Sequence, residues 1–150
     1  LEYICAGELL REAGVKILDT GFADETAVAE LVMQRVQQAS DSMQGFVLDG
    51  FPRTRFQTSY LKERSVVPTH VLVLKASAEQ IRNRHRLIAA GLLDCGGETH
   101  VTPEVLEQKL RLHSCHSSSA LETYKDKVSF IEMDETPDGA EAVWQQMESR

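Results

Sequence analysis

The sequence has 150 residues, a length typical of one domain that buries its own hydrophobic core. Its 16 Lys and Arg against 23 Asp and Glu give a formal net charge of −7, which does not suit the basic face that duplex nucleic acid requires. No apolar run approaches the roughly 18–20 residues of a membrane span. We therefore expect no nucleic-acid partner and no membrane association, and the three unpaired cysteines favour a reducing, cytoplasmic compartment.

The first third of the chain predicts two helices and a strand. Residues 8–13 form a short helical pattern that ends at Gly14. Asp24 is a typical N-cap for a helix that runs to about residue 38, because the apolar residues after it follow the i, i+3, i+4 spacing. The apolar run 45–49, which is bounded by glycines, predicts a buried strand.

The rest of the chain continues the alternation of helices and strands. The predicted elements are a helix capped by Thr54, a central strand over 70–75, a helix with a capping box at Ser77 and Gln80, a helix from Thr102-Pro103 to about 124, a strand over 128–133 and a last helix from Thr136-Pro137 that carries Trp144. Apolar strands separated by helices predict an α/β fold, in which helices flank a parallel sheet in three layers. We expect a single domain over residues 1–150.

The most specific motif covers residues 46–54. A buried strand ends in Asp49, the chain turns at Gly50 and Pro52, and Arg53 stands at a helix start. Ligands of open parallel sheets bind beyond the carboxyl ends of the strands, and a planar guanidinium suits phosphate. The pattern favours a small phosphorylated ligand, as do the eight basic and four acidic residues of the middle third. A surface turn with a capping acid is the alternative.

This segment, GFVLDGFPRT, resembles the signature of adenylate kinase and its nucleoside monophosphate kinase relatives. Residues 7–11, GELLR, resemble the Gly-Asp-Leu-Leu-Arg of that family, and Arg53 with Gln57 repeats its Arg-x-x-x-Gln spacing. The resemblance covers essentially the whole chain and is closest to the short-lid type, with an AMP-binding arm over about 7–38 and a lid over about 91–102. The resemblance implies a P-loop kinase-like fold. It also implies an activity, transfer of the γ-phosphoryl group of ATP to AMP.

The resemblance also implies roles for single residues. Arg11 and Arg53 match the two arginines that hold the AMP phosphate, Gln57 matches the glutamine that binds the adenine, and the backbone from Gly50 to Arg53 lines the pocket. Asp49 matches the acid that orients the water shell of the Mg²⁺ that accompanies ATP.

Two further residues match positions on the ATP side of the family's site. Arg84 matches an arginine that lies near ATP, and Lys109 stands where an arginine contacts the phosphates. The match is weaker there because Glu98 and Ile88 replace two other arginines. An arginine that stabilises the transition state contributes about 10³–10⁵ in rate, so we expect weak catalysis at best.

Within the 150 residues no G-x-x-x-x-G-K-[ST] occurs, so the P-loop and the first strand of the family are missing. Three interpretations stay open. The chain is the remainder of a larger protein whose P-loop lies upstream of Leu1, or it is a degenerate, non-catalytic scaffold or interaction module, or it is a self-sufficient enzyme. The last is disfavoured because nothing in it stabilises ATP. The second would place a protein partner on the incomplete sheet edge and allows an axonemal location.

Cysteine and histidine residues cluster in the last third. Cys95, His100, His113, Cys115 and His116 lie close in sequence, but they lack the paired Cys-x-x-Cys spacing of structural zinc sites. We therefore predict no metal site.

Overall fold

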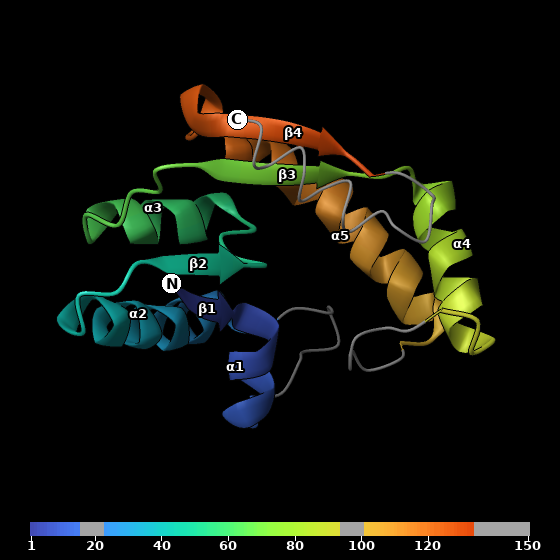
Figure 1. Cartoon of the computed structure of the whole chain (residues 1–150), viewed down its shortest axis with the longest axis horizontal. Coiled ribbons are helices and arrows are strands. Elements are labelled where there is room, and N and C mark those ends of the chain that lie inside the picture. The colour runs from blue at the N-terminus through green and yellow to red at the C-terminus, as the bar shows by residue number, and fades with distance from the viewer. Residues whose placement is uncertain (16–22, 94–100, 134–150) are drawn as a thin grey trace. The chain divides into compact units, whose positions relative to one another are not determined.

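The computed structural model describes residues 1–15, 23–93 and 101–133 (Figure 1). In these residues it contains the strands β1 (Glu2–Cys5), β2 (Phe46–Asp49), β3 (Val71–Lys75) and β4 (Val128–Glu132), the helices α1 (Ala6–Glu12), α2 (Glu25–Asp41), α3 (Arg55–Glu63), α4 (Ala78–Ala89) and α5 (Pro103–Glu122), and a 3₁₀ turn at Lys125–Lys127. The predicted α/β fold with parallel strands is confirmed.

The chain divides into two compact units. Unit 1 consists of Leu1–Val67 and Arg111–Thr123, and unit 2 consists of Pro68–Leu110 and Tyr124–Arg150. Within the described residues, each unit contains one pair of parallel strands, β1–β2 in unit 1 and β3–β4 in unit 2.

The pair β1–β2 includes a strand that the sequence analysis did not predict. β1 is only four residues long and begins with the polar Glu2, so its pattern is too short to indicate a strand by itself. It forms because it pairs in parallel with β2, with Cys5 opposite Asp49. The helix that follows it, α1, carries Gly7 and Arg11.

The pair β3–β4 aligns Val71 with Val128 and Lys75 with Glu132. The sequence predicted β3 as a central strand, yet among the described strands β4 is its one neighbour. Accordingly Leu72 and Leu74 stay 42% and 54% exposed. A parallel strand is normally buried on both faces, so this unit carries unusual apolar exposure.

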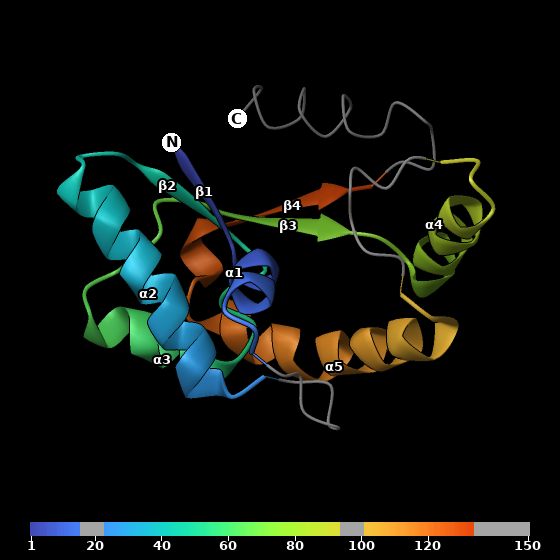
Figure 2. The ribbon, with the colours of Figure 1, turned by 90° about the horizontal axis from the view of Figure 1, so that it is seen from below.

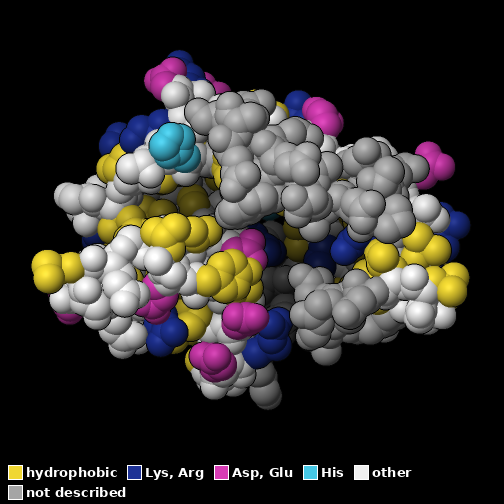
Figure 3. All heavy atoms as spheres, viewed as in Figure 1, with side chains coloured by type: hydrophobic (Ala, Val, Ile, Leu, Met, Phe, Trp, Pro, Cys, Tyr) yellow, Lys and Arg dark blue, Asp and Glu magenta, His cyan; other side chains and the backbone are white. Residues whose placement is uncertain are grey.

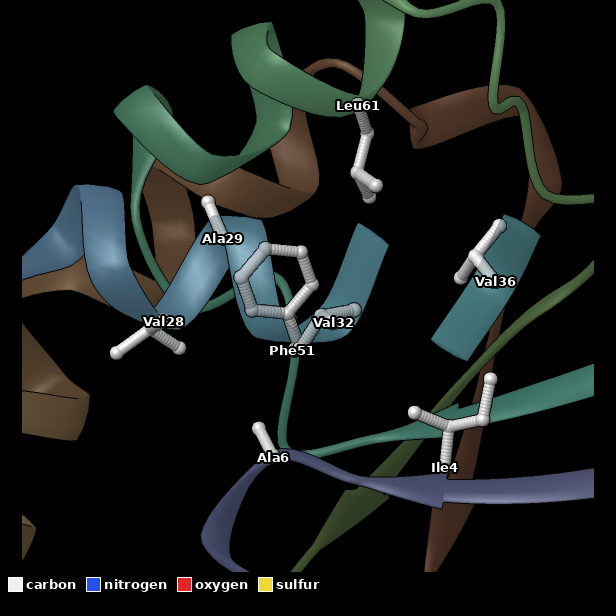
Figure 4. Close-up of a cluster of buried hydrophobic side chains, with 8 residues drawn as sticks. All are labelled: Ile4, Ala6, Val28, Ala29, Val32, Val36, Phe51 and Leu61. Carbon is white, nitrogen blue, oxygen red and sulfur yellow. The ribbon is translucent and has the colours of Figure 1, made fainter. Parts of the chain in front are cut away.

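The core of unit 1 is built around α2, which contacts β1, α1 and α3 (Figure 2). The predicted spacing of its apolar residues is confirmed, because they form one buried stripe. The buried cluster consists of Val28, Ala29, Val32 and Val36 of α2, with Ile4, Ala6, Phe51 and Leu61 (Figure 4).

The predicted caps are confirmed at three helices. The Asp24 carboxylate accepts from the Ala27 amide at 2.8 Å, and Thr54 caps α3. Ser77 and Gln80 form the expected capping box of α4. α5 ends at Glu122, slightly before the predicted end. The expected last helix, which carries Trp144, lies outside the described residues.

Candidate functional site

The carboxyl ends of β1 and β2 lie at one edge of the unit 1 sheet. Parallel pairing places Cys5 beside Asp49, so the helix that follows β1 and the turn that follows β2 begin at neighbouring points. Each of these segments carries one of the predicted phosphate-binding arginines, Arg11 and Arg53. The sheet thus brings two sequence-predicted segments to the edge where ligands of parallel sheets bind.

Arg53 is held by the turn that precedes it. Its Nε donates to the Gly50 carbonyl at 2.8 Å. Gly50 has a φ of +69°, and a Cβ placed on it would lie only 2.7 Å from Arg53 Nη2. The left-handed backbone conformation therefore favours glycine, and a Cβ at this position would displace the guanidinium. Among the described residues no carboxylate forms an ion pair with Arg53, and none accepts a hydrogen bond from its Nη nitrogens.

Gln57 connects the start of α3 to the same turn. The side-chain Oε1 of Gln57 accepts a hydrogen bond from the backbone amide of Arg53 at 2.7 Å. The backbone amide of Gln57 donates to the Thr54 hydroxyl at 3.3 Å. The side chain is buried, with an exposed fraction of 7%. One amide oxygen is thus used to fix the backbone of Arg53, and the Nε2 group is the part of Gln57 that remains for a ligand.

Arg11 folds back toward the start of α1. A Cβ placed on Gly7 would lie 3.7 Å from Arg11 Nη1 and 3.8 Å from Cys5 Sγ, so the guanidinium lies near the carboxyl end of β1. Glu8, Arg11 and Glu12 are all exposed. Figure 3 shows acidic and basic side chains next to one another over this helix.

Asp49, the last residue of β2, has a partner that the sequence analysis missed. The Tyr3 hydroxyl donates to Asp49 Oδ2 at 2.5 Å, a length typical of a charge-assisted hydrogen bond. This hydrogen bond is the largest cause that raises the pKa of Tyr3 above its usual value. Desolvation of the hydroxyl and the negative charge of Asp49 raise the pKa further. No local pattern could have indicated the contact, because the two residues are 46 positions apart.

Arg84 and Lys109 lie in unit 2, on α4 and α5, and both are exposed. Arg82, also on α4, forms an ion pair: its Nε and Nη2 donate to the two carboxylate oxygens of Glu107 at 2.6 and 2.9 Å. One turn further along α4, His85 Nε2 lies 2.7 Å from the Val101 carbonyl oxygen. These two contacts join α4 to the beginning of α5.

The described part of the chain offers neither a metal-binding cluster nor a membrane-spanning helix. It contains no group of three or more His, Cys, Asp or Glu side chains that could hold a metal ion. Cys95 and His100 lie outside the described residues. None of the described helices has the length and apolar character needed to cross a membrane.

The fold and the strand edge define an α/β protein in which a helix and a turn that each carry an arginine follow the parallel strands β1 and β2. Comparisons with known proteins agree with this class. A family described as "AAA domain" matches residues 1–89. An adenylate kinase of Rhodopirellula baltica is 31% identical over 139 residues, which cover 82% of this chain and 68% of the relative.

Two further relatives carry the same name. An adenylate kinase of Archaeoglobus fulgidus is 27% identical over 184 residues, covering 97% of this chain and 84% of the relative. Adenylate kinase 1 of a Nostoc species is 27% identical over 147 residues, covering 87% and 74%. The chain belongs to the adenylate kinase family, as the resemblance of its motifs indicated.

Proposed function

We propose that this chain binds a nucleoside monophosphate of the AMP type at the carboxyl edge of β1–β2. The observation that carries the proposal is the pairing of Cys5 with Asp49, because it sets the segments of Arg11 and Arg53 at one edge. Neither guanidinium group forms an ion pair with a carboxylate of the described residues. Both can therefore provide the hydrogen-bond donors and the positive charge that a phosphate dianion requires.

The base would be recognised by Gln57. Its Oε1 is occupied by the Arg53 amide, so the Nε2 group would donate to a ring nitrogen of adenine. The burial of Gln57 supports this role, because a side chain fixed by its own hydrogen bond loses little entropy on binding.

The chemistry of the family would be in-line transfer of a phosphoryl group from ATP to the bound monophosphate. Mg²⁺ bound with ATP would neutralise charge on the transferring phosphates. Asp49 is the carboxylate available at the strand edge, and one carboxylate suits an ion that keeps its water shell. Tyr3 fixes the orientation of that carboxylate through Oδ2.

We further propose that these 150 residues do not perform the transfer by themselves. They contain no G-x-x-x-x-G-K-[ST], so no backbone cradle and lysine of that kind serve the ATP phosphates. By the family resemblance, the exposed Arg84 and Lys109 would belong to the ATP side of the reaction. The free thiols of Cys5 and Cys115 support a cytoplasmic location for the same protein.

A non-catalytic interaction module is the second candidate. The observation that favours it is the apolar exposure of the parallel strands, with Tyr3 at 59%, Val47 at 47% and Leu74 at 54%. In that case a protein partner would cover the incomplete sheets, as exposed strand edges favour pairing with another chain. An axonemal location belongs to this candidate alone.

Calorimetric titration of the full chain with AMP tests the first candidate. We expect binding, and we expect Arg53→Ala to weaken it by about tenfold or more, since hydrogen bonds to charged groups contribute about 1.5–3 kcal/mol each. Arg55→Ala is the matched control, because Arg55 is exposed two residues away at the first position of α3.

Two results would contradict the proposal. Equal losses in Arg53→Ala and Arg55→Ala, or no AMP binding at millimolar concentration, would favour the interaction module. Formation of ADP from ATP and AMP at an enzyme-like rate by the 150 residues would refute the claim that they do not catalyse transfer.

A further inference from the structure

A chain of hydrogen bonds connects α2 with α3. The Thr54 hydroxyl donates to Glu25 Oε1 at 2.5 Å, across 29 positions of the sequence. The same hydroxyl oxygen accepts from the Gln57 amide at 3.3 Å. Glu25 belongs to the first turn of α2, so this contact joins the beginnings of two helices.

The chain of hydrogen bonds continues to the guanidinium of Arg53. Gln57 Oε1 accepts from the Arg53 amide at 2.7 Å, and Arg53 Nε donates to the Gly50 carbonyl at 2.8 Å. A continuous path therefore leads from a carboxylate on α2 to the arginine of the proposed phosphate site.

The acceptor on Glu25 determines how the Thr54 hydroxyl is oriented. A hydroxyl can donate one hydrogen bond. When a carboxylate accepts that hydrogen bond, the lone pairs of the hydroxyl oxygen are directed to other donors. Here the other donor is the Gln57 amide. Thr54 and Gln57 are only 8% and 7% exposed, so water cannot easily replace a lost acceptor.

We propose that Glu25 is a positioning residue for Arg53, acting through Thr54 and Gln57. Its carboxylate fixes the hydroxyl that caps α3, the cap fixes Gln57, and Gln57 fixes the Arg53 backbone. The consequence for ligand affinity rests on the proposed AMP site, whereas the effect on the Arg53 backbone does not.

The experiment combines amide hydrogen exchange by NMR with AMP titration of the full chain. Glu25→Ala removes the acceptor, and Thr54→Val removes the hydroxyl. We expect the Arg53 and Gln57 amides to exchange faster in both variants, and AMP affinity to fall by about three- to tenfold, as residues of one hydrogen-bond network are coupled. The amide of the buried Leu61, further along α3, should keep its exchange rate.

Three control variants separate positioning from a general loss of stability. Glu25→Gln removes the charge but keeps an acceptor oxygen, so it should restore most of the protection that Glu25→Ala loses. Thr54→Ser keeps the hydroxyl and should behave like the unchanged protein. Glu30→Ala removes the same charge from an exposed position of α2 and should leave the Arg53 amide unaffected.

The possible outcomes are distinct. If the Arg53 amide exchanges equally in Glu25→Ala and Glu30→Ala, Glu25 does not position Arg53 and the inference is wrong. If Leu61 exchanges faster to the same extent as Arg53, Glu25 has a general structural role and the inference is also wrong. Failure of the unchanged chain to bind AMP contradicts the proposed function alone, because faster exchange at Arg53 in Glu25→Ala would still support the positioning role.

Discussion

Replacing Gly50 by alanine should weaken both the fold and the proposed phosphate site, for different reasons. The backbone cost arises from the φ of +69°, a left-handed conformation that costs an L-residue about 1–2 kcal/mol. In a chain of this size that loss corresponds to a melting temperature lower by about 2–8 °C. The contact with Arg53 adds little to this cost, because a flexible guanidinium can move away from a new Cβ.

The movement of Arg53 has its consequence in binding. A Cβ at position 50 would lie 2.7 Å from Nη2 and 3.5 Å from Cζ, so the side chain must leave the Gly50 carbonyl that now fixes Nε. An arginine that is no longer fixed must be ordered by the ligand, which costs about 0.5–1.5 kcal/mol for a side chain of this type. We therefore expect AMP to bind about three- to tenfold more weakly.

The chain offers a matched glycine for the stability measurement. Gly91 also has a φ of +69°, but no heavy atom lies within 4 Å of a Cβ built on it. Urea denaturation should therefore show similar losses for Gly50→Ala and Gly91→Ala. Gly50→Ala should have little further effect on AMP affinity when Arg53 is already alanine. A full additional loss in that double variant would refute the reasoning, as would an unchanged AMP affinity in Gly50→Ala alone.

Three other outcomes are expected. Leu61→Ala should lower the free energy of unfolding by about 2–5 kcal/mol, because Leu61 is 1% exposed, whereas Val67→Ala at 56% exposure should change it little in the same urea titration. Asp24→Ala should cost about 1 kcal/mol by thermal denaturation, because it removes the cap of α2, and Asp24→Asn should keep most of the stability. Ultraviolet titration should show Tyr3 ionising above the usual tyrosine range, and Asp49→Asn should shift its pKa back toward that range. Because the folded-state pKa of Tyr3 is raised, its stabilising contribution is complete below the ordinary tyrosine pKa and is lost as the pH rises through the raised value.

The helices could be predicted from the sequence because their signals are local. Asp24 caps the helix that begins one residue later, and Ser77 and Gln80 contact each other across three positions. β1 could not be predicted in this way, because four residues with a single fully buried side chain become a strand only through pairing with β2. The residues of the candidate site could be named from two motifs, over 7–11 and 46–57, but the contacts that hold these residues could not be predicted.

Those contacts join residues that are distant in the sequence. Tyr3 reaches Asp49 and Glu25 reaches Thr54, across 46 and 29 positions respectively. Tyrosine and glutamate are ordinary surface residues by type, and only the strand register and the packing of α2 on α3 give them a specific partner. A motif therefore predicts which residues take part in a site better than it predicts what holds them in place.

The register of β1 on β2 connects the core to the candidate site. Ile4 and Tyr3 are neighbours in one strand, so they point to opposite faces of the sheet. Ile4 is 2% exposed in the core of unit 1, while Tyr3 meets Asp49 on the other face. A shift of one residue would expose Ile4 and turn Tyr3 away from Asp49. The hydrophobic free energy of burying Ile4 thus also selects the alignment of Cys5 with Asp49, and with it the edge at which both arginine-bearing segments begin.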